Sequence, residues 1–115
     1  MPILMIAMVP SLSSAAQQIP IVALPGAVFS VPGTGGSKSY LPPIVVVPKG
    51  SNAKFTNLDI QGHNIVSDKG KWPDPFLIQT GASEVIPLFG LPAATYGFHC
   101  SAHPWMKGKF IIKKL

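Results

Sequence analysis

The chain has 115 residues, 47% of them hydrophobic and 11% charged, so it is long enough to bury a core as a single domain. Nine basic side chains, all lysine, and four acidic ones give a net charge of +5. The lack of arginine disfavours nucleic-acid binding, because the planar guanidinium is what reads bases and grips phosphates bidentately. A single cysteine excludes an internal disulfide framework.

The first 16 residues differ from the rest. Seven apolar residues at positions 3–9 precede Ser13-Ser14-Ala15-Ala16, whose small side chains are typical of a signal-peptidase site. The run lacks a basic start and is much shorter than the roughly 20 residues of a membrane span. We expect residues 1–16 to be a shortened or atypical export signal, or else an ordered extension or interfacial anchor. Residues 17–115 would then form one domain outside the cytoplasm, in the periplasm or at the outer face of the cell membrane.

Thirteen prolines and eleven glycines indicate short strands joined by tight turns. The run at 19–24 contains Pro20, which predicts an edge strand, because proline cannot donate to a ladder. Residues 28–31 are expected to continue the same sheet after a Pro-Gly turn. A β-branched run at 44–47 ends at the turn signal Pro48-Lys49-Gly50.

Five further strands are expected in the rest of the chain. Alternation at 53–57 puts Ala53, Phe55 and Asn57 on one face. A strand at 63–67 would open with His63, and Asp68 to Pro75 would form a surface loop around Trp72. Residues 84–88 form a second edge strand because of Pro87, and runs at 95–100 and 109–113 follow. Seven or eight short strands predict an antiparallel β-sandwich.

The only cysteine lies in the spacing Cys100-x2-His103-x2-Met106, between the last two predicted strands. Alternation puts Cys100 on the same face as Tyr96 and Phe98, while His99 points the other way. A thiolate, two imidazoles and a weak thioether are the ligands of a blue-copper site. His63 is the candidate for the second imidazole. Taken one at a time, each of these side chains would most often be ordinary packing, so the indication comes from their combination.

With these residues, the sequence resembles a cupredoxin of the amicyanin and plastocyanin group over residues 19–113, with the short amicyanin-like ligand loop. The resemblance implies a Greek-key β-sandwich that binds one type 1 copper ion. The implied ligands are His63, Cys100 and His103, with Met106 as the weak axial ligand. It also implies that Asn64 bonds toward Ser101 and the Cys100 sulfur, and that Gly62 offers a distant backbone carbonyl.

The resemblance further implies a one-electron carrier, cycling Cu(I)/Cu(II) between redox partner proteins, rather than an enzyme. A monomer would dock transiently at the His103 end, using Pro104, Trp105 and Lys107, although Trp105 could instead pack inward to wedge the loop. The lysines are expected to steer an acidic partner, to lie near an anionic membrane or simply to solvate the surface. They include Lys69, Lys71, Lys107, Lys109, Lys113 and Lys114.

Two other kinds of function remain open from the sequence. One is a copper carrier or sensor that holds the metal without shuttling electrons. The other is an enzyme, with Cys100 as a nucleophile beside His103 or with zinc on the same ligands. Met106 has no use in either enzyme chemistry, which counts against both.

Overall fold

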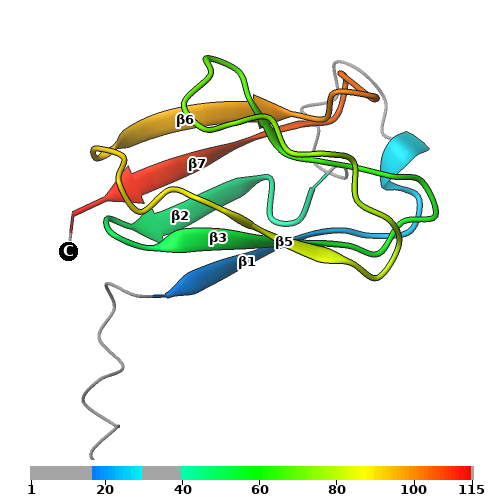
Figure 1. Ribbon diagram of the computed structural model, residues 1–115, viewed down its shortest axis with the longest axis horizontal. Helices are drawn as coiled ribbons and strands as arrows, with labels where there is room; N and C mark the ends of the chain where they lie inside the picture. Colours follow the sequence, from blue (N-terminus) through cyan, green and yellow to red (C-terminus); the bar gives the residue numbers. More distant parts are fainter. Residues whose placement is uncertain (1–16, 30–39, 115) are drawn as a thin grey trace, which may run out of the picture.

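The computed structural model describes residues 17–29 and 40–114, which contain seven strands and no α-helix. The strands form two facing layers (Figure 1). They are β1 (Gln18–Ala23), β2 (Ile44–Pro48), β3 (Asn52–Asn57), β4 (Val66–Ser67), β5 (Ser83–Ile86), β6 (Ala94–His99) and β7 (Lys107–Lys113). A 3-10 turn, η3 (Ala27–Phe29), follows β1. The predicted export signal at 1–16 lies outside the described residues.

One sheet has the order β1-β3-β5 and the other the order β2-β7-β6-β4, which confirms the predicted β-sandwich. The sheets are mixed rather than wholly antiparallel, because β1 pairs parallel with β3 and β2 parallel with β7. The chain leaves β1 for β2 in the opposite sheet before it returns to β3. Neighbours joined by such a crossover run parallel, whereas a tight hairpin makes them antiparallel.

The core follows the predicted alternation. Ala53, Phe55 and Asn57 of β3 are buried, and so are Tyr96, Phe98 and the following Cys100. The ring of Phe98 lies 5.1 Å from that of Tyr40 and 4.7 Å from that of Phe110, measured between centroids. Strand β6 therefore delivers the cysteine to the end of an aromatic cluster.

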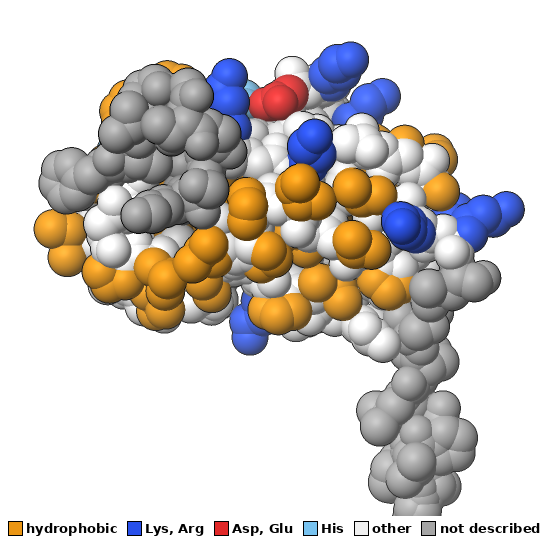
Figure 2. All heavy atoms as spheres, turned by 180° about the vertical axis from the view of Figure 1, so that it is seen from behind, with side chains coloured by type: hydrophobic (Ala, Val, Ile, Leu, Met, Phe, Trp, Pro, Cys, Tyr) orange, Lys and Arg blue, Asp and Glu red, His pale blue; other side chains and the backbone are white. Residues whose placement is uncertain are grey.

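Both predicted edge strands, β1 and β5, do lie at the edges of their sheet. Figure 2 shows the face opposite to that of Figure 1, where hydrophobic side chains are spread over much of the surface and lysines lie around them. The second sheet also leaves apolar side chains in solvent, since Ile44 and Val46 of its edge strand β2 are both 51% exposed. No helix long and apolar enough to cross a membrane occurs in the part of the chain that the structure describes.

Two predicted strands are wrong in their extent. The run expected at 28–31 begins as the 3-10 turn η3, because Gly26 has a φ of +93° and the backbone N–H groups of Gly26 and Val28 donate to the Asp59 carboxylate. Positions 30 and 31 lie outside the described residues. Strand β4 begins only at Val66, and His63 forms an isolated bridge with Ile78.

The loop at 68–75 is anchored more deeply than expected. Trp72 is buried, its Nε1–H donates to the Ile65 carbonyl at 3.0 Å, and its ring lies edge-on to Phe110 at 5.7 Å. The tryptophan is thus part of the hydrophobic core instead of lying on the surface.

Gly108 faces Phe98 across the β6–β7 ladder, and an added Cβ would lie 2.5 Å from the Phe98 Cζ and 2.8 Å from the Pro43 carbonyl oxygen. The Phe98 ring is fully buried, and the Pro43 carbonyl is a backbone group held by the Lys109 N–H, so neither can give way easily. We expect Gly108→Ala to lower the free energy of unfolding by about 1–3 kcal/mol, measured by urea denaturation.

The matched control is Gly90→Ala, since nothing lies within 4 Å of a Cβ added there. It should change stability by less than about 0.5 kcal/mol. Equal stability of the two variants would contradict the close packing at Gly108.

Candidate metal centre

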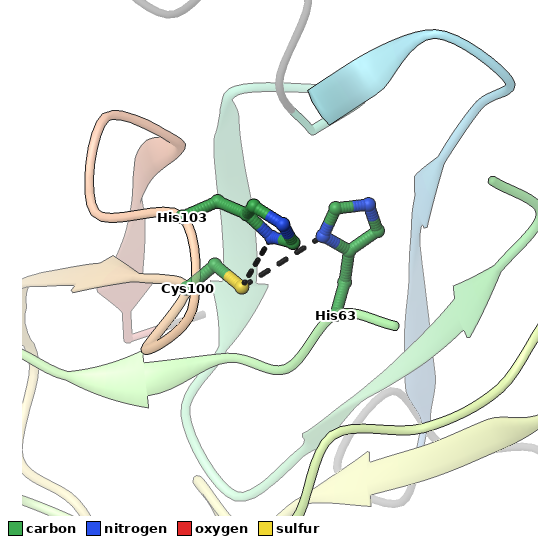
Figure 3. Close-up of side chains that lie close together, drawn as sticks. All are labelled: His63, Cys100 and His103. Atoms are coloured by element: carbon green, nitrogen blue, oxygen red, sulfur yellow. Dashed lines mark hydrogen bonds between the residues drawn. The ribbon is translucent and has the colours of Figure 1, made fainter. Parts of the chain in front are cut away.

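Three side chains with metal-binding atoms meet at one end of the sandwich. The Cys100 sulfur lies 3.7 Å from Nδ1 of His63 and 3.5 Å from Nδ1 of His103 (Figure 3). One donor atom from each of the three residues lies within 4.8 Å of the others. Two imidazole nitrogens therefore face one sulfur.

The hairpin between β6 and β7 explains the Cys-x2-His-x2-Met spacing. The last ladder pair is His99 with Lys107, so the next pair in register is Cys100 with Met106. The Cys100 N–H donates to the Met106 carbonyl at 3.1 Å, and the Met106 N–H donates to the His103 carbonyl at 2.8 Å. Cysteine and methionine thus stand opposite each other at the base of the turn, with His103 near its tip.

Burial differs among these residues. His63, Cys100 and Met106 have no exposed surface, whereas His103 is half-buried. Met106 lies in the hydrophobic core cluster, in the same turn as the other two loop residues. Of these four residues, only His103 is therefore accessible at the surface.

Asn64 ties together the segments that carry His63 and Cys100. Strand β4 pairs Val66 with His99, and the same register carried two residues further puts Asn64 opposite Ser101. The Asn64 side chain accepts from the Ser101 N–H at 2.9 Å and donates to the Ser101 Oγ at 2.9 Å. The backbone N–H groups of Asn64 and Ala102 hydrogen-bond the Cys100 sulfur.

Tyr40 also holds the segment that carries His63 and Asn64. Its hydroxyl donates to the Asn64 carbonyl at 2.6 Å. Burial, together with the nearby charge of Cys100, raises the pKa of Tyr40 above its ordinary value, so the phenol stays neutral and acts as a donor. The segment that carries His63 is therefore fixed by a phenol as well as by an amide.

Asp59 is a residue of the centre that the sequence did not predict. One of its oxygens lies 2.7 Å from Nε2 of His63, and both side chains are fully buried. Burial alone would raise the pKa of Asp59, but hydrogen bonds from His63 and from the N–H groups of Gly26, Ile60 and Val28 hold it below the ordinary value. The available signal was the Asp59-x3-His63 spacing in a chain with only four acidic residues.

The donors around Cys100 change its acidity. Burial would raise the pKa of the thiol, but its hydrogen bonds with His63, the Asn64 N–H, His103 and the Ala102 N–H outweigh burial and lower the pKa to about 6. A thiolate is the metal-binding form of cysteine. A thiolate with two imidazoles and a buried thioether close by is a donor set that suits copper.

The fold and this geometry agree with a family match. The model for copper binding proteins of the plastocyanin/azurin family matches residues 27–113. The chain belongs to this family. It is a cupredoxin, a copper-binding protein of the blue copper type.

Solved structures carry the same fold. A purple cupredoxin from Nitrosopumilus maritimus is 25% identical, with a TM-score of 0.69 over 84% of this chain and 100% of its own. A mutant of amicyanin in its reduced Cu(I) form is 21% identical, with a TM-score of 0.64 over 84% of this chain and 82% of its own. A copper-containing nitrite reductase from Thermus scotoductus is 19% identical, with a TM-score of 0.61 over 86% of this chain but only 23% of its own. A search of curated proteins found no match.

The remaining predicted site residues lie as follows. His99 faces away from the cupredoxin centre, as expected, and its Nδ1 lies 2.5 Å from Asp68. Gly62 is half-buried directly before His63, and its carbonyl contact stays a prediction. Pro104 and Lys107 are exposed. Trp105, in contrast, is half-buried and packs inward, with its Nε1–H donating to the Val28 carbonyl at 3.0 Å.

In the metal-free cupredoxin we expect the Cys100 thiol to titrate at about pH 6, well below the value of about 8.5 for a free cysteine. The ultraviolet absorbance of the thiolate, with Cys100→Ser as the baseline, should therefore rise as the pH passes through about 6.

The same lowered pKa makes the stability of the metal-free protein depend on pH. Between the two pKa values the unfolded chain binds the extra proton, so this group contributes stability that is fully present above about pH 8.5 and is lost as the pH falls to about 6. A thiolate midpoint at the free-cysteine value would contradict the assigned hydrogen bonds.

Proposed function

We propose that this cupredoxin is a one-electron carrier whose copper is bound by His63, Cys100 and His103, with Met106 as the weak axial ligand. The observation that supports this assignment most is that donor atoms of the two histidines and the cysteine lie within 4.8 Å of one another. Copper bound there would supply the Cu(I)/Cu(II) couple.

The donor set suits both oxidation states. The sulfur atoms of Cys100 and Met106 favour Cu(I), while imidazole also suits Cu(II). The hairpin hydrogen bonds and the Asn64–Ser101 pair hold these side chains in place. We infer that the ligands move little when an electron arrives or leaves.

Electrons would enter and leave through His103, the half-buried histidine of the centre. Exposed Pro104 and Lys107 would contact the partner directly, and Trp105 would contribute through its packing against the His103 ring, 5.5 Å away between centroids. Small, weak interfaces suit transient redox encounters, and a monomer with a charge of +5 would attract an acidic partner.

A copper carrier or sensor is the alternative. Handing over a metal requires access to its ligands, yet His63, Cys100 and Met106 are completely buried. This burial favours electron transfer. We propose no enzymatic activity, because the likeness to nitrite reductase covers only 23% of that chain. We propose an extracytoplasmic location, as the export-like composition of residues 1–16 predicts.

We expect addition of Cu(II) to the metal-free protein to produce an intense visible thiolate-to-copper charge-transfer band. Cys100→Ser should abolish this band, because it removes the thiolate, and His63→Asn should shift or weaken it, because it removes an imidazole ligand. His99→Asn is the matched control, since its ring points away from the centre and it should keep the band.

Voltammetry of the copper-loaded protein should then give a reversible one-electron wave, and the copper should resist a chelator. No band in the wild-type protein would contradict the copper ligands. A band combined with rapid loss of copper to the chelator would favour the copper carrier instead.

We expect the rate of electron transfer from an anionic redox reagent to fall as the ionic strength rises, because opposite charges attract less strongly in salt. Stopped-flow kinetics would measure this fall. Lys107→Gln should lower the rate at low salt by up to a few-fold, while Lys113→Gln, at the far end of β7, should have less effect. Rates independent of salt would remove the lysines from the docking proposal.

A further inference from the structure

Both oxygens of the buried Asp59 carboxylate are engaged. Oδ1 accepts from the backbone N–H groups of Gly26 at 3.1 Å and Ile60 at 2.8 Å. Oδ2 accepts from the Val28 N–H at 3.1 Å and lies 2.7 Å from Nε2 of His63. Buried charges persist where donors surround them, and here the donors come from two distant parts of the chain.

This contact selects which nitrogen of His63 faces the Cys100 sulfur. An ionised carboxylate can only accept hydrogen bonds, so the His63 nitrogen next to Asp59, Nε2, carries the proton. The other ring nitrogen, Nδ1, then faces the Cys100 sulfur, and Figure 3 shows the ring in this orientation. A histidine that binds a metal through one nitrogen commonly donates from the other to a carboxylate or carbonyl.

A chain of contacts through the η3 turn also connects the Asp59 carboxylate to His103. Val28 donates its N–H to Asp59 and accepts at its carbonyl from the Trp105 indole, 3.0 Å away. The Trp105 ring packs edge-on against His103, with 5.5 Å between centroids and an angle of 69°. Figure 1 places η3 beside the loop that joins β6 to β7.

We propose that Asp59 is a positioning residue for both histidines of the centre. It holds His63 directly, and it holds His103 through the Val28 peptide and the Trp105 ring. This inference rests on the proposed function, in which the two histidines bind copper. It assigns a role to Trp105 that differs from partner docking, because the indole N–H is used inside the molecule.

The test compares Asp59→Asn, Trp105→Phe and the double variant. Asp59→Asn removes the negative charge and replaces one carboxylate oxygen with an NH2 group, which would face N–H donors instead of accepting from them. It should weaken Cu(II) affinity by about 10–100-fold in a chelator competition. It should also shift the reduction potential upward, because a negative charge near the metal stabilises Cu(II), and alter the Cu(II) electron paramagnetic resonance spectrum.

Trp105→Phe keeps a ring against His103 but removes the indole N–H, so it should cause a smaller loss of affinity. The loss in the double variant should be smaller than the product of the two single losses, because both changes break one chain of contacts. Purely multiplicative losses would overturn the link to His103.

The matched control is Asp68→Asn, which also removes a carboxylate bonded to a histidine, in this case His99 outside the centre. It should leave affinity, potential and spectrum at wild-type values. Wild-type values in Asp59→Asn as well, or the same change in both variants, would overturn the proposal.

A measurement on the wild-type protein keeps the proposal testable if Asp59→Asn fails to fold. The Nε2 proton of His63 should exchange slowly with solvent in nuclear magnetic resonance spectra of the metal-free protein and of the diamagnetic Cu(I) form. Rapid exchange would overturn the role of Asp59. An absent visible band in the wild-type protein would instead contradict the proposed function, so the two failures are distinguishable.

Discussion

A cysteine sulfur buried at the end of an aromatic cluster is the constraint on which this molecule depends. A thiolate in such surroundings persists only if donors replace the water it has lost, and the fold supplies them from several directions. The N–H groups of Asn64 and Ala102 hydrogen-bond the Cys100 sulfur, and Nδ1 of His63 and of His103 lies within 3.7 Å of it. The sandwich can therefore be understood as a frame that brings these donors to one atom.

The register of the strand pairs positions the residues around the sulfur. Pairing of β6 with β7 sets Cys100 against Met106, and pairing of β4 with β6 sets Asn64 against Ser101, so the ladders continue into the centre after the strands end. Because β1 and β3 run parallel, the segments that follow the two strands, η3 and Asp59, lie at the same end of the sandwich (Figure 1). There the turn η3 lies within hydrogen-bonding distance of Asp59 and Trp105.

Local patterns predicted the parts of the structure that local patterns control. Alternation in β3 and β6 identified the buried faces, because side-chain direction along a strand depends only on neighbouring residues. The parallel pairings were not predicted, because the residues of a strand do not indicate which non-consecutive strand it pairs with. Asp59 was missed for a related reason. Composition argues against a buried carboxylate, and two of the four donors that make this one favourable lie 31 and 33 residues away in the sequence.

In the proposed electron carrier, the half-buried ring of His103 limits where partner proteins can exchange electrons with the copper. With a single accessible edge on the centre, an electron donor and an electron acceptor would have to occupy the same small area of surface. The two encounters would exclude each other, so each delivery would require release of one partner and diffusion to the next. Turnover in such a chain is then governed by how quickly the complexes dissociate, and tight binding to either partner would slow it.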